Sequence, residues 1–226
     1  MRIYLTEFIG TFFLVLTIGL TVIPSLAFAP LAIGAALMVM VYMGGHVSGA
    51  HYNPAISFAV FLRGKMKSAG ELAGYIVSQI LGATIAALMV RTLLGQTFAP
   101  APGDGVSVTS ALLVEFLFTF ALALVVLNSA ASARTQGNSF YGLAIGFTIV
   151  VGAFAGGGIS GGAYNPAVGI GPTLVHAAFG GGSLSDLWIY LVGPLLGAAA
   201  GSAVFALQER PEVHLRAEPS RTPEHR

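Results

Sequence analysis

Two stretches of the sequence, VSGAHYNPA at residues 47–55 and ISGGAYNPA at residues 159–167, share Ser-Gly near their start and Tyr-Asn-Pro-Ala at their end. Asparagine is a preferred helix N-cap, because its side-chain oxygen accepts hydrogen bonds from the first backbone N–H groups of the helix. Proline suits the next position, since it has no N–H to leave unpaired and its φ is already helical. Each stretch therefore predicts a helix that begins directly after the asparagine.

Both predicted helices are short, because the apolar runs that follow the asparagines cover only residues 54–62 and 166–176. Roughly ten helical residues are about 15 Å long, which is half of the ~30 Å hydrocarbon core of a bilayer. Other apolar stretches reach the about 20 residues that a membrane span requires. These lie at 3–23, 30–48, 71–94, 109–130, 140–157 and 186–207. The pattern predicts six transmembrane helices and two re-entrant half-helices.

The composition excludes most other classes of protein. Hydrophobic residues make up 55% of the chain and charged residues only 8%, whereas soluble domains carry about 25% charge. The net charge of +1 excludes the basic surface of a nucleic-acid-binding protein. The chain has no cysteine, which leaves no disulfide framework and no cysteine-based metal site. We expect an all-α protein embedded in a lipid bilayer, with no nucleic-acid partner and no cofactor.

The two halves of the sequence repeat one another. Glu-Phe-x-x-Thr-Phe at Glu7 recurs at Glu115, and the tyrosine that opens a third shared pattern, Tyr75, recurs as Tyr190. With the Asn-Pro-Ala motifs between them, the order of the motifs is the same in both halves. Each half holds three predicted spans, so the second copy is inverted in the membrane, an architecture of many transport proteins. We predict one membrane domain over residues 1–208, with repeats at about 1–95 and 108–208, and a disordered cytoplasmic tail over 209–226.

The basic residues predict the orientation of the chain. With the N-terminus in the cytoplasm, nine of the ten Lys and Arg residues fall on the cytoplasmic side, and only Arg91 lies near the outer side. The nine are Arg2, Arg63, Lys65, Lys67, Arg134, Arg210, Arg216, Arg221 and Arg226. This is the distribution that the positive-inside rule describes. Both termini are therefore expected in the cytoplasm, in a multi-pass protein of the cell membrane.

The half-helices enter from opposite sides, so Asn53 and Asn165 are expected to meet near the midplane. Both helix N-termini would direct the positive end of their dipoles at this point, which disfavours cations. The amide groups and the loop carbonyls would bind a small, neutral, hydrogen-bonding solute. A secondary transporter coupled through Glu7 or Glu115 is an alternative, because intramembrane carboxylates are often functional. An intramembrane enzyme would have only His46, His51 and these carboxylates, without a nucleophile.

From about residue 3 to 207 the sequence resembles the aquaporins, or major intrinsic proteins. The resemblance rests on the Glu-x-x-x-Thr-Phe openings, on Gly-His-Val-Ser-Gly at 45–49, on Gln79 with Gly-Ala at 82–83, and on both Asn-Pro-Ala motifs. It implies a right-handed six-helix bundle with two half-helices, one pore in each chain and usually a homotetramer. The implied pore motifs are Asn53, Pro54, Ala55, Asn165, Pro166 and Ala167. It also favours Glu7, Glu115 and His46 as residues that support the loops, and a channel rather than an enzyme.

The same resemblance places a selectivity filter at four positions counted from the motifs, which are Ile33, Ala153, Gly162 and Val168 here. Strict water channels usually carry an aromatic residue, a histidine, a small residue and an arginine at these positions. Valine in place of the arginine is similar to the plant vacuolar branch and to some bacterial members. The loss of the ring, the imidazole and the fixed charge predicts a wider and more apolar outer gate. We expect a passive channel for water and small neutral solutes; the alternative is a facilitator of urea, ammonia, hydrogen peroxide or glycerol with water secondary.

Overall fold

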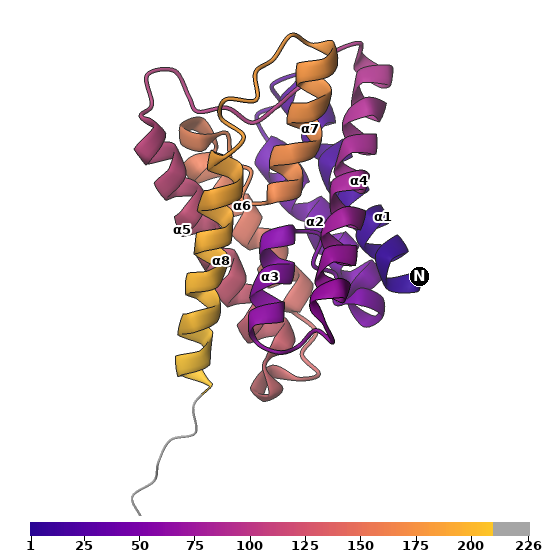
Figure 1. Ribbon diagram of the computed structural model, residues 1–226, viewed down its shortest axis with the longest axis vertical. Coiled ribbons are helices and arrows are strands. Elements are labelled where there is room, and N and C mark those ends of the chain that lie inside the picture. The colour runs from indigo at the N-terminus through magenta and orange to yellow at the C-terminus, as the bar shows by residue number, and fades with distance from the viewer. Residues whose placement is uncertain (210–226) are drawn as a thin grey trace, which may run out of the picture.

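The computed structural model describes residues 1–209, which form eight α-helices, one π-helical turn (η1) and one 3₁₀ turn (η2), without a strand in this range (Figure 1). The first half holds α1 (Arg2–Val22), α2 (Ala29–Ser48), α3 (Pro54–Leu62) and α4 (Ala69–Leu94). The second half holds α5 (Val108–Val126), η1 (Leu127–Ala131), η2 (Ala133–Thr135), α6 (Tyr141–Ser160), α7 (Pro166–Phe179) and α8 (Ile189–Gln208). From residue 210 onward, the predicted tail lies outside the described range.

Six spans are long and apolar enough to cross a membrane, the fourth being α5 together with η1. Their ends agree with the predicted spans to within three residues. The predicted fold class is therefore confirmed. One local difference occurs at the end of the fourth span, where the α-helix changes to the π turn at Leu127. There the side chains of Asn128 and Ser129 donate to the carbonyls of Leu124 and Val125, at 3.0 and 2.6 Å. Such side-chain bonds compete with regular helical pairing.

The helices of the two halves pack in the same way. Helix α1 packs against α4, and α5 packs against α8. At the first crossing, a Cβ atom on Gly82 would lie 2.5 Å from the carbonyl oxygen of Phe8. At the second crossing, a Cβ atom on Gly197 would lie just as close to the carbonyl oxygen of Phe116. Both contacts require glycine, because small residues let the backbones of membrane helices approach closely.

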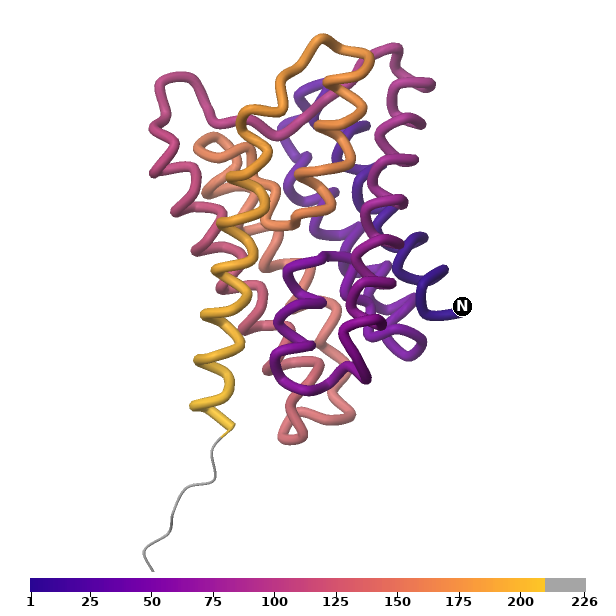
Figure 2. Tube along the Cα trace, viewed as in Figure 1, coloured from indigo at the N-terminus to yellow at the C-terminus, as the bar shows by residue number. Residues whose placement is uncertain are grey.

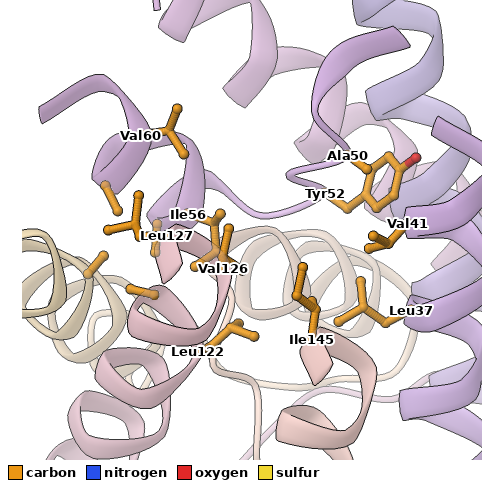
Figure 3. Packing of buried hydrophobic residues seen from close by; sticks show 14 of the residues in the cluster. Leu37, Val41, Ala50, Tyr52, Ile56, Val60, Leu122, Val126, Leu127 and Ile145 are labelled. Carbon is orange, nitrogen blue, oxygen red and sulfur yellow. The ribbon is translucent and has the colours of Figure 1, made fainter. Parts of the chain in front are cut away.

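The two half-helices lie one above the other in the middle of the bundle, α7 above α3 in Figures 1 and 2, with their N-termini toward each other. Each half-helix also packs against the other half of the chain: α3 contacts α8, and α7 contacts α4. Beside α3, an apolar cluster joins α2, α5 and α6 (Figure 3). Its labelled members include Leu37, Ile56, Leu122, Val126 and Ile145. The half-helices are thereby enclosed in protein, as irregular backbone at membrane depth requires.

Candidate functional site

The two asparagines cap their helices as the sequence predicts. The side-chain oxygen of Asn53 accepts from the backbone N–H of Ala55 at 2.8 Å and of Ile56 at 3.4 Å. The side-chain oxygen of Asn165 accepts from the backbone N–H of Ala167 at 2.9 Å. Proline follows each asparagine as the first residue of the helix. The capping oxygens are thus occupied, and only the amide nitrogens remain to bind other groups.

The amide nitrogens join the two halves of the chain. The Nδ2 of Asn53 donates to the backbone carbonyl of Tyr164 at 2.8 Å, and the Nδ2 of Asn165 donates to the carbonyl of Tyr52 at 2.9 Å. Each asparagine therefore holds the loop in front of the other asparagine. A side-chain amide carries two N–H donors, so one N–H of each residue is left for the cavity that both asparagines line.

A buried glutamate holds each of these loops. The carboxylate of Glu7 accepts from Ser48 Oγ at 2.6 Å and from the backbone N–H groups of His51 and Tyr52 at 3.0 and 2.7 Å. It also accepts from Gln79 Nε2 at 2.7 Å. Because Tyr52 has a left-handed φ of 50°, which is uncommon outside glycine, these bonds fix an otherwise unfavourable backbone.

Glu115 makes the same contacts in the second half. Its carboxylate accepts from Ser160 Oγ at 2.8 Å and from the backbone N–H groups of Ala163 and Tyr164 at 2.9 and 2.6 Å. Tyr164 has a left-handed φ of 48°. The fourth donor of the first half has no counterpart, because Pro194 occupies the position that corresponds to Gln79.

The two histidines near the first loop, His46 and His51, have different surroundings. His46 lies in the last turn of α2 with an exposed side chain, and no hydrogen bond of this side chain is found within residues 1–209. The Nδ1 of His51 lies 3.0 Å from Ser57 Oγ, which also accepts from Gln79 Nε2 at 2.9 Å. The contacts of His51 thus tie its loop to α3, while loop support by His46 stays a prediction.

Two pairs of tyrosines that the sequence analysis did not select complete the loops. The hydroxyls of Tyr52 and Tyr164 donate to helix carbonyls, those of Met40 at 2.9 Å and Gly152 at 2.8 Å. The hydroxyls of Tyr75 and Tyr190 donate to the carbonyls of Ser48 and Ser160, at 2.6 and 2.5 Å. Each pair occupies equivalent positions of the repeats, and this equivalence was the signal that could have identified them.

A cavity of about 420 Å³ extends from one end of the bundle to the asparagine pair. All four predicted filter positions line it: Ile33, Ala153, Gly162 and Val168. None of the four carries a polar side chain, and no Asp, Glu, Lys or Arg of the described chain lines this cavity. The cavity therefore offers an apolar wall and, at its inner end, the amide donors of Asn53 and Asn165.

A second cavity of about 320 Å³ opens on the other side of the loops. Lys65 and Glu71 contribute to its lining, so this side is more polar. Only His51 and Val126 line both cavities. His51 and Val126 therefore lie between these two cavities.

A bundle of six spans that encloses two half-helices, with one cavity on each side of their loops, has the architecture of a membrane channel. A sequence model of the family described as Major intrinsic protein matches residues 1–205. The chain is 40% identical over 213 residues to Glycerol uptake facilitator protein-like 6 of Lactiplantibacillus plantarum, covering 88% of this chain and 94% of that protein. It is 36% identical over 219 residues to Aquaporin NIP1-4 of Oryza sativa subsp. japonica, covering 92% and 77%.

Among solved structures, the X-ray structure of the aquaglyceroporin from Plasmodium falciparum has the same fold. The TM-score is 0.74 at 24% sequence identity, and the likeness covers 91% of this chain and 93% of that one. The chain belongs to the major intrinsic protein family. It is an integral, multi-pass membrane protein and a channel of that family.

Proposed function

We propose that this channel conducts water together with neutral solutes up to about the size of glycerol, passively and in both directions. The observation that carries the proposal concerns the cavity of about 420 Å³, which we call the outer cavity. In its wall, the four predicted filter positions present no charge and no large ring: Ile33, Ala153, Gly162 and Val168. A filter of this kind rejects little by size and binds no ion. The name of the relative from Lactiplantibacillus plantarum, a glycerol uptake facilitator-like protein, supports a solute wider than water.

Exclusion of ions follows from the asparagine pair. The N-termini of α3 and α7 face each other, and each carries the equivalent of roughly half a positive charge. A cation would leave its hydration shell in an apolar cavity and then meet two positive helix ends. A water molecule at the centre would accept from the free N–H groups of Asn53 and Asn165. It could then not also accept a proton from a neighbouring water, which interrupts a proton wire.

Passive conduction is favoured over coupled transport by the contacts of the two buried carboxylates. Glu7 accepts from four donors and Glu115 from three. Groups engaged in this way hold the loops and are not exposed to a cavity. The alternative, a secondary transporter, differs in one measurable property: its uptake would require an ion or proton gradient.

The proposed setting is the cell membrane, with both termini in the cytoplasm and the second cavity on the cytoplasmic side. The positions of Arg63, Lys65, Lys67 and Arg134 support this orientation, because these residues lie at the same end of the bundle as that cavity, whereas Arg91 lies at the other end. The expected assembly is a homotetramer, and this expectation rests on the resemblance to the family.

The proposal is tested by stopped-flow swelling and shrinking of proteoliposomes in water, urea and glycerol gradients. The protein and Val168→Arg are compared, with size-exclusion chromatography to show that both are folded. We expect the protein to conduct all three and Val168→Arg to retain water flux while losing most urea and glycerol flux. Flux of water alone through the unsubstituted protein would contradict the wide filter. Uptake that requires an ion gradient would contradict the passive channel.

A further inference from the structure

The segment between α4 and α5 contributes to the wall of the outer cavity. It runs across the end of the bundle at which α7 also ends (Figures 1 and 2). Its residues Phe98, Ala99, Pro100 and Ala101 all line the cavity, beside the filter positions. Phe98 is the only aromatic residue among them. A loop, rather than a transmembrane helix, thus brings a ring to a gate whose helical positions carry none.

We infer that Phe98 is a fifth gate residue, which sets the upper size limit for solutes in the outer cavity. This inference rests on the proposed function, because it concerns which solutes the same channel admits. The four filter positions carry only aliphatic side chains or none, so they leave a wide opening. The ring of Phe98 takes up part of that opening and limits the length and branching of the solutes that pass.

The ring has a defined place in the protein. It packs against the apolar cluster that contains Val15 and Val168, and it is partly buried there. Gly19 of α1 leaves room for it, since a Cβ atom at this position would lie 2.6 Å from the Cε1 of Phe98. A ring that packs against α1 and this cluster is part of the wall and does not merely cover the opening.

The segment that carries Phe98 is held on both sides of the ring. The Oγ1 of Thr97 lies 2.8 Å from the Nδ1 of His176, near the end of α7. Further along, the backbone N–H of Gly103 donates to the carbonyl of Ile159 at 3.0 Å. Gly161 approaches Ala101 so closely that a Cβ would lie 2.7 Å from its backbone nitrogen. A side chain acts as a size limit only when its support is fixed, and these contacts fix it.

The test is the permeability of proteoliposomes to polyols of increasing length, namely glycerol, erythritol and xylitol, always relative to water. For Phe98→Ala we expect erythritol and xylitol flux to rise by about tenfold, the lower end of the discrimination that one methylene contact provides, with water flux little changed. For Phe98→Trp we expect glycerol flux to fall while water flux remains. Phe28→Ala is the matched control, because Phe28 is 74% exposed near the same opening and does not line the cavity.

The outcomes separate this inference from the proposed function. Suppose that the unsubstituted protein conducts water and glycerol, and that Phe98→Ala and Phe98→Trp have the same polyol permeabilities as the unsubstituted protein. Phe98 is then not a gate residue, and the channel proposal stands. If the unsubstituted protein conducts no solute, the proposed function fails first. Should Phe98→Ala fold poorly in chromatography, Phe98→Leu keeps most of the apolar packing, and a smaller rise in erythritol flux is then expected. An unchanged Phe98→Leu would overturn the inference.

Discussion

Gly34 and Gly146 face each other where α2 crosses α6, so closely that a Cβ atom on either would lie 2.5 Å from the carbonyl oxygen of the other. This crossing joins the two halves of the chain. A side chain can rotate away from an intruding methyl group, but a helix backbone in contact cannot. The crossing therefore holds the distance between α2 and α6, which carry the predicted filter positions Ile33 and Ala153.

Gly34→Ala is expected to destabilise the protein by about 1–3 kcal/mol, the usual cost of forcing a methylene into a packed interior. Thermal unfolding in detergent, followed as the fraction that remains monodisperse, measures this effect. Gly158→Ala is the matched control, because a Cβ at Gly158 has open space and alanine favours a helix over glycine. Equal melting of Gly34→Ala and the unsubstituted protein would show that the crossing relaxes freely.

Glu7→Gln is expected to lower stability by at least about 2 kcal/mol, because hydrogen bonds to a charged acceptor are strong and the new NH₂ group would face donors. Glu115→Gln should cost less, since Glu115 lacks the fourth donor that Gln79 provides to Glu7. The same thermal assay compares the two, with Asp104→Asn at an exposed carboxylate as control. A Glu7→Gln protein of unchanged stability whose uptake no longer depends on a proton gradient would instead indicate a coupling residue.

Asn165→Asp is expected to admit cations, because a carboxylate places negative charge where two positive helix ends meet. Aspartate still caps a helix, so the fold should survive, although the bond to the carbonyl of Tyr52 is lost. A pH-sensitive dye trapped in proteoliposomes under a potassium diffusion potential measures proton flux. Asn165→Ser, a neutral cap, is the control; if it leaks protons as much as the aspartate does, charge is not the cause.

Tyr164→Phe removes only the hydroxyl that donates to Gly152 and is expected to cost about 1 kcal/mol. Tyr164→Ala removes a completely buried ring and is expected to cost about 3–5 kcal/mol. Chemical unfolding monitored by tryptophan fluorescence separates the two. Equal and small effects would mean that the ring of Tyr164 does not hold the loop before Asn165.

The sequence predicted the long helices well because each one is a local apolar run of sufficient length. The bounds of α3 were predicted to the residue, whereas α7 extends to Phe179, three residues beyond the predicted end. The π turn at Leu127 was not predicted, because composition does not distinguish one helical winding from another.

The capping by Asn53 and Asn165 was also predictable, since the cap acts on neighbouring residues. Contacts across the fold were not. Asn53 bonds a carbonyl 111 residues away, and no periodic pattern marks such a partner. Phe98 lies in an irregular loop, so nothing in its neighbourhood of the sequence assigns it to the cavity. The contact of His51 with Ser57 depended on which way the chain turns after α2.

The exchanged bonds between the two loops have a consequence for the synthesis of the protein. The carbonyl of Tyr164 that Asn53 requires emerges 111 residues later, which at about 5–20 residues per second takes roughly 6–22 s. Until then the first half has its helices but an unpaired amide in the interior of the membrane. Helices α7 and α8 are synthesised later still, and a chain that stops before Tyr164 lacks the carbonyl that pairs Asn53 with the second half.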